Sequence, residues 1–372
     1  MALPHLRWIG TAAGQSPPMF EGTVPDLATI PDAERHVCTG IQGSVGSIQL
    51  NRPRALNALT AEMVADIDGA LHAWASEPLT AVVISSTNPK AFCAGGDIRA
   101  VQENTVAGDH AASARFFSTE YALNLSLARY QTPLVALIDG ICMGGGLGVS
   151  VHGAFRIVTE NASLAMPETT IGFFPDIGAS YFLSRLPGGL GAYLGLTGYR
   201  LDAADALYTG LATHFIPSTD IDSVPAHLAA TPRVPIDECL RRMAPRTLSA
   251  DSYLAAHRTS IDRCFLAPTI DEIRRRLCTE SSTWATETLE LLASKSPQSL
   301  EVTSALLARG RQHDLGQCLD AELDVALQMT RTADFVEGVR AALVDKDRAP
   351  RWSRSQFTGF DACGKSQWVE VN

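Results

Sequence analysis

The sequence predicts an α/β fold with a helical C-terminal part, and three observations support this prediction. Short apolar runs at residues 81–84, 134–138 and 155–158 are typical of buried strands. Helical segments separate these runs, which favours parallel strands joined by right-handed crossovers. After about residue 230 no strand-like run appears, and apolar residues recur at helical spacing.

The elements follow in order along the chain. Residues 1–35 have no clear period and are interpreted as an N-terminal extension, whereas residues 36–50 predict a hairpin. Thr60 is the expected N-cap of a first helix, and a second helix is expected over residues 111–130, before Pro133. We predict a core over residues 36–230, a linker near 225–235, a helical subdomain over 231–352 and a tail over 353–372.

The composition excludes several classes of function. The chain of 372 residues has 30 Lys and Arg against 40 Asp and Glu, a net charge of −10, which argues against nucleic acid as the partner. Its eight cysteines show no zinc spacing, so we expect no metal site and reduced thiols in a cytoplasmic protein. The most apolar stretch, residues 140–151, is too short for a membrane span, and the first residues contain no apolar region of signal-peptide length.

Two glycine-rich loops are candidate binding elements. They cover residues 91–99 and 139–153, and each one follows a buried strand and precedes a helical segment. Together they could direct two backbone N–H groups at one oxygen atom, although each could equally be a tight turn. A phosphate-binding P-loop is absent, and His152 stands where a nucleophile elbow requires glycine, so we interpret His152 as a packed helix residue.

Three carboxylates are candidates for acid–base chemistry. Glu168 and Asp176 lie among apolar neighbours in a loop rich in proline and glycine, where burial would raise their pKa. Glu120 lies on the same predicted helix side as Phe116 and Phe117 and has no basic residue three or four positions away. The alternative for all three is an ordinary solvated acid.

Four segments, residues 50–60, 91–99, 139–153 and 165–183, resemble the crotonase superfamily, also called the enoyl-CoA hydratase/isomerase family. Residues 296–303 and 334–352 resemble a hydrolase subgroup of that family, so the similarity covers about residues 36–352. The resemblance implies a crotonase-like spiral of ββα units with two sheets, followed by helices. It also implies an acyl-CoA thioester substrate and no separate cofactor, because coenzyme A is part of the substrate.

The resemblance assigns roles to individual residues. It places the oxyanion-hole amides at Ala94 and Gly145, and the contact with the coenzyme A nucleotide at Arg54 and Ala55. The surrounding loop residues Gly95, Gly96 and Asp97 are expected to bind substrate. Glu168 and Asp176 are the expected catalytic pair, and Glu120 is expected to bind the hydroxyl side of the substrate.

One departure from the family pattern bears on the reaction. Hydratases of the family use two glutamates, and the position of one of them is Gly148 here. We therefore expect hydrolysis of a short-chain 3-hydroxyacyl-CoA, such as the 3-hydroxyisobutyryl ester of valine breakdown or the 3-hydroxypropionyl ester. Glu168 would either attack the thioester or activate water. The alternatives are an enoyl-CoA hydratase or isomerase and a non-catalytic acyl-CoA-binding protein. The resemblance allows a homo-oligomer, or one chain whose C-terminal helices cover the same surface.

Overall fold

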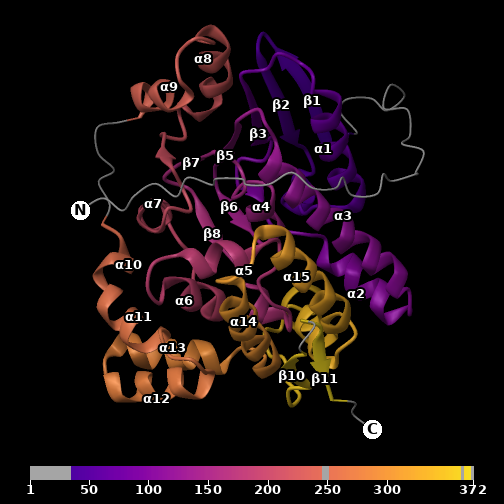
Figure 1. Ribbon diagram of the computed structural model, residues 1–372, viewed down its shortest axis with the longest axis vertical. Helices are drawn as coiled ribbons and strands as arrows, with labels where there is room; N and C mark the ends of the chain where they lie inside the picture. Colours follow the sequence, from indigo (N-terminus) through magenta and orange to yellow (C-terminus); the bar gives the residue numbers. More distant parts are fainter. Residues whose placement is uncertain (1–34, 245–250, 362–363, 370–372) are drawn as a thin grey trace.

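The described residues contain two main sheets surrounded by helices (Figure 1). The structure is a computed structural model that describes residues 35–244, 251–361 and 364–369. The larger sheet has the order β1-β2-β3-β5-β7-β9, with β1 at Val37–Gln42, β2 at Val45–Leu50, β3 at Ala81–Ser86, β5 at Leu134–Ile138, β7 at Phe155–Val158 and β9 at His214–Phe215. The smaller sheet has the order β4-β6-β8, with β4 at Ala91–Cys93, β6 at Ile141–Met143 and β8 at Ser163–Ala165.

A repeated unit organises both sheets. The first two strands form an antiparallel hairpin, as the sequence predicts, and the other neighbouring strands of the two sheets run parallel. Three times the chain passes from the larger sheet to the smaller sheet and then into helix, at β3–β4, β5–β6 and β7–β8. This order confirms the α/β prediction and the ββα spiral.

The first helices begin where the sequence predicts them. Thr60 caps α1 (Ala61–Ala73), because its hydroxyl accepts a hydrogen bond from the Met63 amide at 3.3 Å. After α2 (Ile98–Val106), Asp109 caps α3 (His110–Arg129) by accepting a hydrogen bond from the Ala112 amide at 2.9 Å. One face of α3 is buried, and this face carries Glu120.

Short helices follow, and two of them cover the outer face of the larger sheet. They are α4 (Gly145–Gly148), α5 (Ala179–Phe182), α6 (Leu190–Thr197), α7 (Ala203–Thr209), α8 (Val224–Ala230) and α9 (Ile236–Met243). Side chains of α8 and α9, including Leu228 and Leu240, form an apolar cluster with Val83 and Val135 of the sheet. The linker expected near residues 225–235 is therefore wrong, because Pro225 lies in the first turn of α8, where its missing N–H costs nothing.

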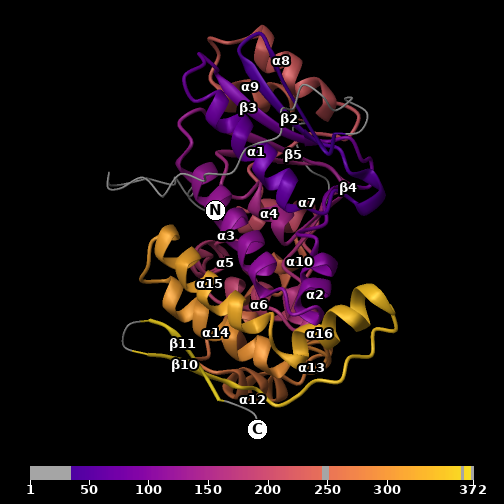
Figure 2. The same cartoon turned by 90° about the vertical axis from the view of Figure 1, so that its right-hand side faces the viewer.

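The C-terminal helices pack on the opposite end of the molecule from α8 and α9 (Figures 1 and 2). They are α10 (Tyr253–Ala256), α11 (Arg258–Phe265), α12 (Ile270–Glu280), α13 (Thr283–Ala293), α14 (Pro297–Gly310), α15 (Leu315–Met329) and α16 (Ala333–Val339), followed by a π-helical turn at Arg340–Val344. One continuous apolar cluster runs from Val37 in β1 to Phe357, so these helices share their core with the spiral.

The predicted tail contains ordered strands. β10 (Phe357–Phe360) and β11 (Ser366–Trp368) form an antiparallel pair, and Asp324 of α15 accepts hydrogen bonds from the amide and hydroxyl of Ser366. The predicted N-terminal extension, apart from residue 35, lies outside the described residues. Within the described ranges, no helix is long and apolar enough to cross a membrane, and no group of three or more potential ligands is placed to hold a metal ion.

Candidate active site

The three predicted carboxylates lie together in the interior. Glu120 comes from α3, Glu168 begins a 3-10 turn at Glu168–Ile171, and Asp176 lies in the loop before α5. Their exposed fractions are 2%, 7% and 6%. This burial decides between the two alternatives left by the sequence, because solvated acids are excluded.

Burial raises the pKa of all three carboxylates. For Glu120 and Glu168 the pKa lies well above its usual value, first because of burial and second because of the charge of Asp176. Burial also raises the pKa of Asp176 to about 7, against the opposing effect of a hydrogen bond from Tyr121. Each group therefore releases its proton at a higher pH than an ordinary acid does.

Two of the carboxylates lie directly against the glycine turn that starts α4. A Cβ atom on Gly144 would lie 2.6 Å from Glu168 Oε1, and one on Gly145 would lie 2.5 Å from Glu120 Oε1. Larger residues are therefore excluded at both positions. Glu120 Oε1 and Glu168 Oε2 are buried atoms that accept no hydrogen bond within the described part of the chain. Such oxygens are suited to receive a bound substrate or water.

The structure assigns one of the two expected oxyanion donors differently. The Ala94 amide donates to the Leu56 carbonyl at 3.0 Å, so it is already used to hold the loop, and the expectation for Ala94 is corrected. The Gly96 amide has no hydrogen bond to any described residue, and its nitrogen lies 3.1 Å from the Cβ position of Gly145. Gly145 is the first residue of α4, where N–H groups lack helical partners. Gly96 and Gly145 therefore form the pair of neighbouring amides.

The rest of the 94–97 loop holds this geometry. Gly95 has φ +113°, in a conformation that favours glycine, and a Cβ on Gly96 would come within 2.9 Å of the Phe116 ring. Asp97 pairs with Arg52 at 2.8 Å and caps α2 through its other oxygen. Both oxygens of Asp97 bond within the protein, so this residue positions the loop. Its expected contact with substrate stays a prediction.

A side chain at the Gly148 position would require its neighbours to shift. A Cβ there would lie 2.9 Å from Asn124 Nδ2 and 3.2 Å from two atoms of Ile177. The Asn124 amide also donates to the Gly148 carbonyl at 3.1 Å. The absence of an acid at this position is thus fixed by the surrounding packing as well as by the sequence.

Tyr121 is a functional neighbour that the sequence did not indicate. Its hydroxyl donates to Asp176 Oδ2 at 2.7 Å inside the protein. His152, in contrast, is packed as expected, although it lies in a turn after α4 and not in a helix. Its Nε2 lies 2.8 Å from the Ile177 carbonyl, and burial lowers its pKa to about 4. At that pKa His152 is neutral and donates to the carbonyl.

The two residues expected to contact the nucleotide lie in a short 3-10 helix at Pro53–Ala55. Arg54 is exposed and makes no ion pair within the described residues, while Ala55 is half-buried. Arg54 is therefore a cation available to an anionic ligand.

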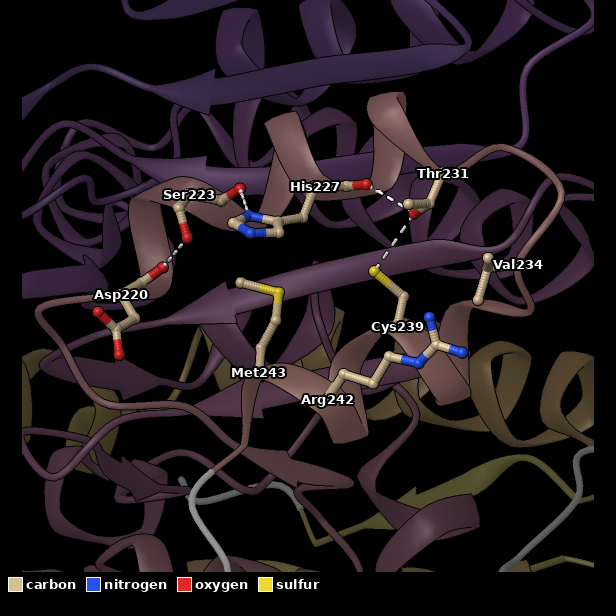
Figure 3. A pocket seen from close by; sticks show the side chains of 8 residues that line it. All are labelled: Asp220, Ser223, His227, Thr231, Val234, Cys239, Arg242 and Met243. Atoms are coloured by element: carbon tan, nitrogen blue, oxygen red, sulfur yellow. Dashed lines mark hydrogen bonds between the residues drawn. The ribbon is translucent and has the colours of Figure 1, made fainter.

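A separate pocket of about 460 Å³ lies between α8 and α9 (Figure 3). His227 of α8 and Thr231, which directly follows α8, face Cys239 and Met243 of α9 across it, and Thr231 Oγ1 lies 3.6 Å from Cys239 Sγ. The three buried carboxylates do not line this pocket. It is therefore distinct from the candidate site.

The known proteins that this chain resembles belong to one family, and their names indicate two kinds of reaction. A family model described as enoyl-CoA hydratase/isomerase matches residues 45–364. A relative named 3-hydroxyisobutyryl-CoA hydrolase 1, from Arabidopsis thaliana, is 42% identical over 343 residues, covering 88% of this chain and 90% of the relative. The mitochondrial 3-hydroxyisobutyryl-CoA hydrolase of Homo sapiens is 41% identical over 329 residues, covering 86% and 85%.

Two similar solved structures carry other titles. A carnitinyl-CoA dehydratase from Mycobacterium thermoresistibile has a TM-score of 0.80 at 38% identity, covering 85% of this chain and 91% of that one. An enoyl-CoA hydratase from Rhodobacter sphaeroides has a TM-score of 0.79 at 38% identity, covering 86% and 93%. The relatives thus include both hydrolases and enzymes that add or remove water.

Proposed function

This chain belongs to the enoyl-CoA hydratase/isomerase family, the crotonase superfamily, and we propose that it hydrolyses 3-hydroxyisobutyryl-CoA to the free acid and coenzyme A. The packing around Gly148 is the observation that carries this choice. It leaves Glu168 as the only one of the two hydratase acids, while Asp176 supplies a second buried carboxylate from another loop. The named hydrolases among the relatives support the same reaction.

The proposed binding mode follows from the donors and acceptors of the site. The Gly96 and Gly145 amides donate to the thioester carbonyl oxygen and stabilise the negative charge that develops on it. Glu120 lies beside Gly145 with one oxygen unused, so it accepts a hydrogen bond from the substrate hydroxyl. Arg54 contacts a phosphate of the nucleotide, with Ala55 beside it.

Glu168 and Asp176 carry the proton and bond changes. Glu168 lies against the glycine turn and acts in one of two ways. Either it attacks the carbonyl carbon, the carbon–sulfur bond breaks to give an anhydride, and water hydrolyses the anhydride to the free acid and restores Glu168. Or it removes a proton from a water molecule that attacks the carbonyl carbon, after which the carbon–sulfur bond breaks. Asp176, whose pKa is about 7, is half protonated near neutral pH and delivers a proton to the leaving thiolate. Water enriched in heavy oxygen separates the routes, since label found in the Glu168 carboxylate after turnover demonstrates the anhydride.

A substrate comparison tests the proposed reaction. The enzyme is mixed with 3-hydroxyisobutyryl-CoA and 3-hydroxypropionyl-CoA, and free coenzyme A is measured with a thiol-trapping dye. In parallel, water addition to an enoyl-CoA is followed by loss of the conjugated absorbance. We expect thiol release without hydration. Hydration without thiol release would instead establish the second candidate, a hydratase like the similar solved structure from Rhodobacter sphaeroides.

The place of the enzyme in the cell and its assembly are further parts of the proposal. Cys93, Cys142, Cys264 and Cys318 are free thiols, which supports a reducing compartment. The sequence favours the cytoplasm, whereas the relatives from Xenopus tropicalis and Homo sapiens are named mitochondrial. Cell fractionation decides between these compartments, and light scattering of the purified protein decides between a single chain and a homo-oligomer.

A further inference from the structure

The loop that carries Asp176 has an unusual backbone. Ile177 has φ +57° and Gly178 has φ +85°, so two consecutive residues adopt a left-handed conformation directly after the aspartate. This conformation is costly for a β-branched residue such as Ile177. The surrounding structure must therefore hold the loop in place.

Glu322 of α15 holds one side of this loop. The side chain is fully buried, and Oε2 accepts the Gly178 amide at 2.7 Å while Oε1 accepts the Ser180 amide at 2.8 Å and its hydroxyl at 2.6 Å. These amides belong to the first turn of α5, which has no side-chain cap of its own. A residue of the C-terminal helices thus caps a helix of the spiral, 142 positions earlier in the chain.

The other side of the loop is held by His152, whose Nε2 bonds the Ile177 carbonyl at 2.8 Å. Within the described part of the chain, the Asp176 side chain accepts one hydrogen bond from another residue's side chain, that of the Tyr121 hydroxyl. The direction of its carboxylate therefore depends on the backbone between these two anchors. Losing an anchor would let the loop relax toward an ordinary conformation and turn Asp176 away from Glu168.

We propose that Glu322 is a positioning residue for thioester hydrolysis, which locks the backbone of residues 176–180 so that Asp176 faces the reacting atoms. This inference rests on the proposed function, because Asp176 touches substrate only in that reaction. Glu322 belongs to neither glycine loop, so its effect falls on the chemical step and leaves substrate binding largely unchanged. It also gives the C-terminal helices a part in catalysis.

The test compares Glu322→Gln with a matched control, Asp205→Asn. Three hydrogen-bond donors face the Glu322 carboxylate. In the glutamine variant the new NH₂ group is also a donor, so at least one of these donors loses its acceptor. Asp205 is equally buried and accepts three hydrogen bonds, from Tyr199, Ser252 and the Leu254 amide, at a place outside the acid cluster. Each variant thus replaces one fully buried carboxylate that accepts three hydrogen bonds.

For Glu322→Gln we expect kcat for thiol release to fall by about 10–100-fold with KM within about threefold, since small misplacement of a reacting group is costly. Hydrogen exchange of the Gly178 and Ser180 amides should rise as well. Asp205→Asn should keep kcat within about threefold. Circular dichroism and thermal unfolding confirm that both variants are folded. Equal losses of kcat in the two variants, or an unchanged kcat in folded Glu322→Gln, would overturn the proposal.

A milder variant covers the case in which Glu322→Gln does not fold. Ser180→Ala removes one of the three hydrogen bonds, and we expect kcat to fall by about 2–10-fold at constant KM. An unchanged kcat for Ser180→Ala would then count against the inference. Absence of thiol release by the wild-type enzyme would overturn the proposed function and this inference with it. Activity in the wild type and an equal activity in the variants would overturn this inference alone.

Discussion

The packing around Gly148 bears on the type of reaction. Asn124 and Ile177 fill the space in which a side chain at this position would have to lie. Because these neighbours come from α3 and from the Asp176 loop, restoring a hydratase-type glutamate would disturb the elements that carry the other acids. The packing around this glycine therefore favours hydrolysis over hydration.

Replacement of Gly148 by alanine should destabilise the protein by about 1–3 kcal/mol, because the added methyl group overpacks the site. Urea unfolding of both proteins measures this loss. Gly69→Ala is the control, since Gly69 is exposed in α1 with nothing within 4 Å of its Cβ position, and this change should stabilise by about 0.5–1 kcal/mol. Equal effects of the two substitutions would contradict the packing described here.

At single positions, the sequence predicted the buried carboxylates better than the backbone amides expected to donate to the thioester oxygen. Glu120 could be predicted because it lies on an apolar helix face without a basic partner. Glu322 has the same signature, with Cys318, Leu319, Val325 and Ala326 at helical spacing, and could have been found in the same way. The Ala94 assignment could not be tested by sequence, because whether an amide is free depends on a partner 38 positions away, the Leu56 carbonyl.

Among the elements, the loop around Asp176 links pH to stability. Asp176 has an ordinary pKa of 3.8 when unfolded and about 7 when folded. A raised pKa means that the folded state binds the proton more tightly, so the stability this residue contributes is present below about pH 4 and is lost as the pH rises through 7. Ionisation of Asp176 therefore costs stability, whereas its protonated form is the one that delivers a proton to the leaving thiolate.

Asp176→Asn should remove this pH dependence. Between pH 5 and pH 8 the variant should gain about 2–3 kcal/mol of unfolding free energy relative to the wild type, because asparagine does not ionise and still accepts the Tyr121 hydrogen bond. Thiol release should fall steeply in the same variant. Urea unfolding at the two pH values gives the difference, and parallel pH dependence in both proteins would show that Asp176 has an ordinary pKa.

Long elements were predicted more reliably than short ones. The helices α1, α3, α12, α13 and α15 show apolar residues at helical spacing over several turns, and all of them are present. The strands β10 and β11 were missed, because runs of four and three residues carry too little alternation to be distinguished from a loop. Their pairing is fixed by contacts with α15 instead.

At the scale of the molecule, the repeated ββα unit is visible only in the structure. The sequence shows no internal repeat, because the three units share a path between two sheets and not a pattern of side chains. The strands of the smaller sheet are three residues long, and such strands leave almost no periodicity. The resemblance to a known family supplied what periodicity could not.

The shared core predicts one cooperative unfolding transition. The apolar cluster that runs from β1 to Phe357 includes residues from both the spiral and the C-terminal helices, and Glu322 bonds across the two parts. Tryptophan fluorescence and circular dichroism should therefore report the same midpoint in urea. Two separated midpoints would show that residues 231–352 unfold as an independent domain.

The central claim is that thioester hydrolysis depends on Glu168, held against the glycine turn inside the acid cluster. It is tested most directly by thiol release from 3-hydroxyisobutyryl-CoA in Glu168→Gln, with the affinity for the same ester measured by calorimetry. We predict that kcat falls by about 10³-fold or more while Kd stays within about threefold, because glutamine fills the same space without a basic or nucleophilic oxygen. A kcat within about tenfold of the wild type would contradict the account.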